Sequence, residues 1–104
     1  MKITNCTEFT LVTHGEFALV FRKDKILFLS AKKLNLDSYL NKELYPNYKD
    51  ASRALHRDIR SVCEKKFNSC DDPVGSGKVT ILLFYHYTQI LKTKFLENAI
   101  FNGW

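Results

Sequence analysis

The sequence of 104 residues lacks the features that mark small secreted proteins and membrane proteins. Its three cysteines are an odd number, whereas a short disulfide-stabilised chain normally contains an even number. No apolar run is longer than that of residues 81–85, which is far below the roughly 20 residues that cross a bilayer. The first residues include no apolar stretch typical of a signal peptide. We therefore expect a cytoplasmic protein in a reducing environment that does not associate with membranes.

Motifs for metals and cofactors are also lacking. No pair among His56, Cys63 and Cys70 has the short spacing of a zinc site, so we expect free, buried thiols. The G-S-G-K motif that ends at Lys78 lacks the first glycine of a phosphate-binding loop and the Ser or Thr that should follow the lysine. The sequence therefore predicts neither a metal nor a cofactor.

The composition is that of one ordinary globular domain. Apolar residues make up 45% of the chain, aromatic residues 13% and charged residues 26%. This apolar content argues against disorder, and half the chain would be too short to form a separate core. With no repeat and no linker in the sequence, we expect residues 1–104 to form a single basic domain with a net charge of +5.

The first part of the chain has the pattern of an antiparallel β-meander. Residues 9–13, 16–22 and 26–30 are rich in β-branched and aromatic side chains and are separated by short polar turns. In the second segment, Phe17, Leu19 and Phe21 share one face. The third segment is apolar on both faces, which predicts a central position in the sheet.

The rest of the chain alternates between helical and extended patterns. Residues 36–44 predict a short helix, and residues 49–67 a longer one with an apolar stripe. A loop over residues 68–77 should lead into a buried strand at 79–85, and a last helix at 88–102 should end at Gly103. The predicted fold class is α+β, in the order β-β-β-α-α-β-α, with the helices on one face of an antiparallel sheet.

The strongest functional signal lies on the predicted helix 49–67. Lys49, Arg53, His56 and Arg60 fall within about 60° of one another on a helical projection, and Arg57 lies beside them. Three of the four arginines of the chain therefore share one face, which extends over about 16 Å. Because the planar guanidinium can bind phosphate oxygens in pairs, this face predicts contacts with nucleic-acid phosphates.

A solvated helix face is the alternative interpretation. In that case Glu64 would pair with Arg60, and Asp50 with Arg53, as ordinary ion pairs along the helix. A basic surface beyond the helix is a further candidate, and its residues are Arg22, Lys23, Lys25, Lys32 and Lys33.

Catalysis receives less support than binding. His14, His56 and His86 could act as acids or bases near neutral pH, but no nucleophile or carboxylate pair accompanies them. A small ribonuclease of toxin type is therefore the third hypothesis, in which a histidine is the base and the arginines hold the phosphate.

We thus expect a non-enzymatic protein that binds nucleic acid through Lys49, Arg53, His56, Arg57 and Arg60. The second hypothesis is an inhibitor or adaptor that docks on an acidic protein surface, with Trp104 or tyrosines as anchors. The excess of Lys over Arg, with abundant Asn, Ile, Phe and Tyr, fits the AT-rich coding of many phages and viruses. An inhibitor encoded by a phage or virus is one version of this second hypothesis.

Overall fold

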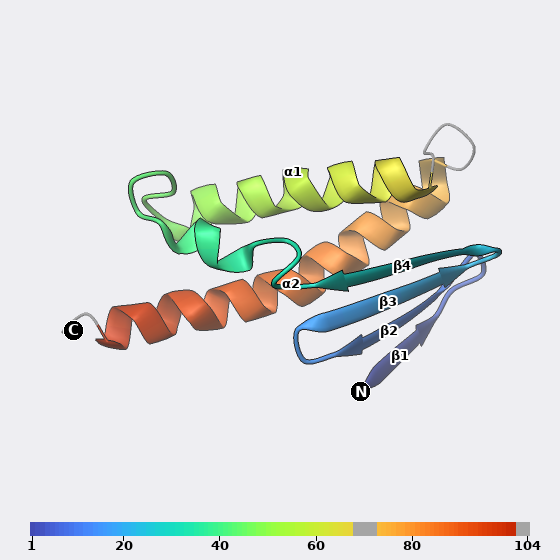
Figure 1. The fold of residues 1–104 in the computed structure, drawn as a ribbon, viewed down its shortest axis with the longest axis horizontal. Coiled ribbons are helices and arrows are strands. Elements are labelled where there is room, and N and C mark those ends of the chain that lie inside the picture. Colours follow the sequence, from blue (N-terminus) through green and yellow to red (C-terminus); the bar gives the residue numbers. More distant parts are fainter. Residues whose placement is uncertain (68–72, 102–104) are drawn as a thin grey trace.

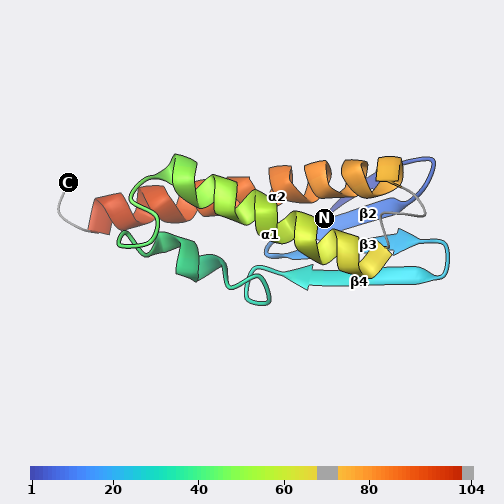
Figure 2. The ribbon, with the colours of Figure 1, turned by 90° about the horizontal axis from the view of Figure 1, so that it is seen from above.

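The structure is a computed structural model that describes the backbone of residues 1–67 and 73–101 and the side chains of residues 1–67 and 77–97 (Figure 1). The protein is α+β, as predicted: a four-stranded antiparallel sheet carries two helices on one face (Figures 1 and 2). The elements in chain order are β1 (Lys2–Asn5), β2 (Thr10–His14), β3 (Phe17–Arg22), β4 (Lys25–Ser30), the 3-10 helix η1 (Leu36–Leu40), α1 (Tyr48–Phe67) and α2 (Pro73–Phe101).

The sheet is a simple meander in the order β1-β2-β3-β4. The three predicted strands are confirmed as β2, β3 and β4, each within two residues of its expected bounds. Two-residue turns join them, and both contain a left-handed residue, Gly15 at φ 56° and Lys23 at φ 52°. Glycine reaches this conformation without steric cost, which favours the tight turn between β2 and β3. Strand β1 was not predicted, because its four residues are too few to show a clear alternation.

Strand β4 lies at the edge of the sheet, so the prediction of a central position is wrong. Its inner side chains, Leu27 and Leu29, are buried beneath the helices, as expected for a core strand. Its outer side chains, Ile26 and Phe28, are 51% and 50% exposed. The apolar character of both faces therefore does not reflect burial on both sides. It reflects an outer sheet face that is itself apolar.

Helix α1 confirms the predicted helix at residues 49–67. Its first turn is capped by the Asn47 side chain, which accepts a hydrogen bond of 3.0 Å from the backbone N–H of Asp50. Ala51, Leu55 and Ile59 are fully buried at helical spacing, and this burial fixes the rotation of the helix about its axis. The shorter helix expected at residues 36–44 is present only as η1, one and a half turns of 3-10 helix.

Helix α2 overturns the strand predicted at residues 79–85 and the order β-β-β-α-α-β-α. Residues 73–77 of the predicted loop and the predicted helix from residue 88 to 101 belong to the same helix, while residues 68–72 and Gly103 lie outside the described residues. Val79, Leu83, Tyr87 and Leu91 are all fully buried, at intervals of four. A short apolar run is compatible with a strand and with a buried helix. Residues 79–85 form a helix because this conformation packs their apolar side chains against the sheet.

The core lies between the inner face of the sheet and the two helices. Leu11, Val20 and Leu29 of the sheet belong to the same buried cluster as Leu55 of α1 and Leu83 of α2. The C-terminal part of α2 extends beyond the sheet, beside η1 and the start of α1 (Figure 1). Neither described helix has a stretch apolar and long enough to cross a membrane.

Two of the three cysteines are described, and both are free thiols. Cys63 is fully buried between α1 and its neighbours, and Cys6 is partly exposed. Burial raises the pKa of the Cys63 thiol, a shift that a hydrogen bond with Thr80 only partly offsets. The prediction of free, buried thiols thus holds for Cys63, whereas Cys6 is free but only partly buried, and Cys70 lies outside the described part of the chain.

Candidate functional site

The outward face of α1 carries a row of cationic side chains. Lys49, Arg53, Arg57 and Arg60 are all exposed, on the side of the helix opposite the buried Leu55. The capped first turn and the buried stripe hold the helix in this rotation, so the row runs along the surface for about three turns. We call these four side chains the cationic face of α1.

Few carboxylates neutralise the cationic face. Among the described ion pairs only Arg57 is engaged, at 3.8 Å between its Nε and Oδ1 of Asp58, both side chains being well exposed. Within the described residues, the pairs expected of a solvated helix, Glu64 with Arg60 and Asp50 with Arg53, are not formed. Arg53 and Arg60 are therefore exposed and form no ion pair within the described residues.

Asp58 makes a second contact in addition to its ion pair with Arg57. Its carboxylate accepts a hydrogen bond from the Tyr39 hydroxyl of η1. Burial raises the pKa of Tyr39 above its usual value, and the hydrogen bond to Asp58 raises it further, so Tyr39 remains a donor. This contact ties α1 to η1 and gives Asp58 a structural role in addition to its pairing with Arg57.

His56 lies at the margin of the cationic face. Its ring packs against that of Phe84 on α2, with 4.6 Å between the ring centroids, and the residue is half-buried. The structure therefore places this predicted site residue at the junction of the two helices, where it borders the row of exposed cations.

The second predicted basic surface is divided. Arg22 is only 6% exposed, and its guanidinium lies 5.4 Å from the centre of the Phe67 ring, under the end of α1. Lys23 and Lys25 are exposed at the turn that begins β4, whereas Lys32 and Lys33 follow its end. With a six-residue strand of about 20 Å between them, the two lysine pairs do not form one surface.

The three histidines lie on different elements. His14 projects from the exposed outer face of the sheet, since its neighbour Thr13 points into the core. His86 of α2 lies on the inner side, where it lines a pocket of about 200 Å³ with Lys2, Thr4 and Leu82. Burial is the main cause that lowers the pKa of His86. A hydrogen bond with the Gly15 backbone raises this pKa in part, and the positive charge of Lys2 lowers it further. The described residues contain no cluster of three or more metal-ligating side chains.

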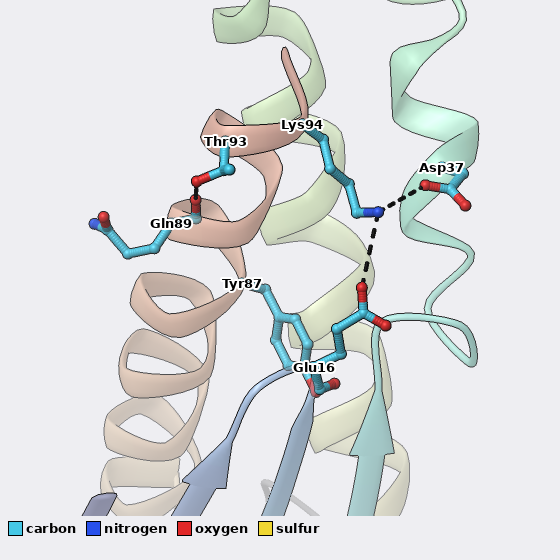
Figure 3. A network of polar contacts seen from close by, with 6 residues as sticks. All are labelled: Glu16, Asp37, Tyr87, Gln89, Thr93 and Lys94. Atoms are coloured by element: carbon cyan, nitrogen blue, oxygen red, sulfur yellow. Dashed lines mark hydrogen bonds and ion pairs between the residues drawn. The ribbon is translucent and has the colours of Figure 1, made fainter. Parts of the chain in front are cut away.

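A pocket that the sequence did not reveal lies at the end of the sheet. Its volume is about 390 Å³, and Lys94 of α2 reaches into it between two carboxylates. The Lys94 Nζ lies 3.2 Å from Oδ1 of Asp37 and 3.8 Å from Oε1 of Glu16 (Figure 3). These three residues are far apart in the sequence and belong to no local motif, so only the fold brings them together.

The chemistry of this pocket is electrostatic. The hydrogen bond to Asp37 is the largest cause that raises the pKa of Lys94. Burial opposes it, and the charges of Asp37, Glu16 and Glu97 act in the same direction as the hydrogen bond. Lys94 is therefore a protonated ammonium and not an amine nucleophile. Its contacts link α2 to η1 and to the β2–β3 turn.

Comparisons with protein-family models, with curated proteins and with solved structures found no match to this chain.

Proposed function

We propose that this protein is a non-enzymatic binding protein that contacts nucleic-acid phosphates through the cationic face of α1. The observation that carries the proposal is the exposure of Lys49, Arg53, Arg57 and Arg60 in one row, with Arg53 and Arg60 in no ion pair within the described residues. A face that served only to keep the helix soluble would gain from the available Glu64 and Asp50 partners.

The dimensions of the row suit a phosphate backbone. From Lys49 to Arg60 the helix rises about 16 Å, and nucleic-acid duplexes carry one negative charge for every 1.7 Å or so of axis. Arginine, the scarcer cation of this chain, provides three of the four side chains and can bind two phosphate oxygens at once. The net charge of +5 favours association with a polyanion from a distance.

We place the protein in a reducing cytoplasm, which the free Cys6 and Cys63 support. His56 borders the cationic face and would contribute through the edge of its ring. Lys23 and Lys25 would add contacts near the end of α1, where Arg22 lies under Phe67.

The salt dependence of binding tests the proposal. If four phosphates are neutralised, the association constant for duplex DNA should fall with salt at a log–log slope of about −3.6. The double variant Arg53→Gln, Arg60→Gln should bring this slope to about −1.8, because each lost cation removes roughly 0.9. Fluorescence anisotropy with a labelled duplex, measured at several salt concentrations, gives both slopes. The same titration with RNA shows which nucleic acid is preferred.

The matched control is Lys2→Gln, Lys92→Gln, which removes the same charge from two exposed lysines outside α1. Its slope should remain close to that of the wild type. Equal slopes for the two double variants would refute the role of α1. Absence of nucleic-acid binding, together with recovery of one stoichiometric protein partner from the native host, would instead support docking on an acidic protein.

A further inference from the structure

The outer face of the sheet carries no Lys, Arg, Asp or Glu among its strand residues. The register of the four described strands places eleven residues on this face, and none of them is Lys, Arg, Asp or Glu, although 26% of the chain is charged. Five large apolar side chains are about half exposed there: Ile3, Phe17, Phe21, Ile26 and Phe28. We call this surface the outer sheet face.

The apolar side chains of the outer sheet face are contiguous. Ile3 pairs with Val12, which pairs with Leu19, which pairs with Phe28, so one apolar row crosses all four strands. Phe17 stacks on Phe28 with 5.7 Å between the ring centroids. Both helices lie on the opposite side of the sheet, as Figures 1 and 2 show.

The exposed apolar area of the outer sheet face can be compared with that of a standard interface. Such an interface takes about 800 Å² from each partner, of which a little more than half is apolar. The three phenylalanines of the outer sheet face alone expose roughly 300 Å², as much as the largest apolar patch of many monomers.

We propose that the outer sheet face is the interface of a homodimer in which two sheets pack face to face. A two-fold axis brings the same surface of each copy together, so an ionic group close to the axis would meet its like. The outer sheet face avoids this repulsion because its strand residues include no Lys, Arg, Asp or Glu, even though each copy carries a charge of +5. The same surface is a poor match for a phosphate backbone, which needs cations beside the stacked bases.

The dimer has a defined architecture. The two sheets would pack about 10 Å apart with their strands crossing at roughly 30°, and the side chains of Phe17 and Phe28 would interdigitate with those of the second copy. The helices would form the two outer layers. Because α1 lies on the inner side of the sheet, the cationic face of each copy would stay accessible, and the dimer would present two of them.

Sedimentation equilibrium across micromolar concentrations tests the interface. The wild type should approach a mass of about 24 kDa, twice that of the 12.1 kDa chain. Phe28→Glu should raise the dissociation constant of the dimer at least about 30-fold, because it places a charge within an apolar interface. An effect of this size is typical of substitutions at the centre of an interface. Phe28 is half exposed in the single chain, so circular dichroism should show an intact fold. Phe28→Leu should retain the dimer.

Ile81→Glu is the matched control, since Ile81 is a similarly exposed apolar residue on α2, away from the outer sheet face. This variant should dimerise like the wild type, and so should Arg53→Gln, Arg60→Gln. A wild type that remains monomeric at the highest concentration overturns the proposal, as does a dimer that Phe28→Glu leaves intact. A monomer whose binding to single-stranded oligonucleotides is lost in Phe28→Leu would identify a base-stacking surface instead.

Discussion

The Tyr87 hydroxyl of α2 donates a hydrogen bond of 2.8 Å to the backbone carbonyl of Leu29 in β4. Both residues are almost completely buried, and they lie 58 positions apart in the chain. The same hydroxyl is 3.3 Å from the carbonyl oxygen of Glu16. Burial raises the pKa of Tyr87, so the hydroxyl keeps its proton and remains a donor. This one side chain therefore fixes the long helix against two segments of the sheet.

Tyr87→Phe should destabilise the fold by about 1–3 kcal/mol, because it leaves buried carbonyl oxygens without this donor while the ring is kept. Urea unfolding followed by circular dichroism measures the change. Tyr85→Phe is the matched control, since Tyr85 lies on the same helix and is 62% exposed. Its effect should stay within about 0.5 kcal/mol. Equal losses in the two variants would contradict the role given to the Tyr87 hydrogen bond.

The contact between Lys94 and Asp37 should contribute modestly to stability and depend on salt. Asp37 is 78% exposed and Lys94 26%, so solvent screens the pair. A double-mutant cycle with Lys94→Met and Asp37→Asn should give a coupling of about 0.5–1 kcal/mol that shrinks at high salt. The pKa of Lys94 is higher in the folded protein than its usual value of 10.5. The contribution of the pair to stability is therefore complete below pH 10.5 and is lost as the pH rises through the pKa of Lys94 in the folded protein. A coupling that is insensitive to salt would contradict an ionic contact.

His86 should make the fold sensitive to mild acid. Its pKa is lowered from 6.5, so the unfolded chain binds more protons than the folded one as the pH falls below that value. The free energy of unfolding should therefore decrease from about pH 7 downwards, toward the pKa of the folded state. His86→Gln should remove this part of the slope in a series of urea titrations.

Lys2→Met provides a second measurement of the same effect. The charge of Lys2 is one of the causes that lower the pKa of His86, so its removal should reduce the pH dependence without abolishing it. If Lys2→Met steepens the slope, or if His86→Gln leaves it unchanged, the assignment to His86 is wrong.

The described thiols should differ in reactivity. Burial and a raised pKa keep Cys63 as a thiol that reagents do not reach, whereas Cys6 is partly exposed. Alkylation of the native protein, read by peptide mass spectrometry, should modify Cys6 first and Cys63 only after urea is added. Rapid labelling of Cys63 in the native protein would show that α1 and α2 separate easily.

Residues 49–67 show where sequence reasoning succeeded. Their apolar positions recur at helical spacing, so the pattern predicts both the helix and the side that faces the core. The exposed positions follow from the same geometry, which is why the sequence alone predicts the exposed row that contains Arg53 and Arg60. The side-chain partners were not predictable, because Glu64 and Asp50 have several rotamers and the fold offers Asp58 a hydrogen bond from Tyr39.

Residues 79–85 show where sequence reasoning failed. β-Branched and aromatic side chains favour strands in isolation, but this propensity is a weak term beside packing. Val79 and Leu83 begin a buried stripe that continues to Tyr87 and Leu91, and only the helix buries all four against the sheet. The site at Lys94 was missed for a related reason, because its carboxylates come from distant segments.

The sequence by itself determined the α+β class, the meander, helix α1 and the scarcity of charge on its apolar strands, since each follows from local periodicity. Tertiary structure decided which of two apolar faces of β4 would be covered. The two helices cover only one side of the sheet, and Leu27 and Leu29 are buried on that side. Ile26 and Phe28 were left on the outside, on a surface whose chemistry is suited to a second copy of the chain.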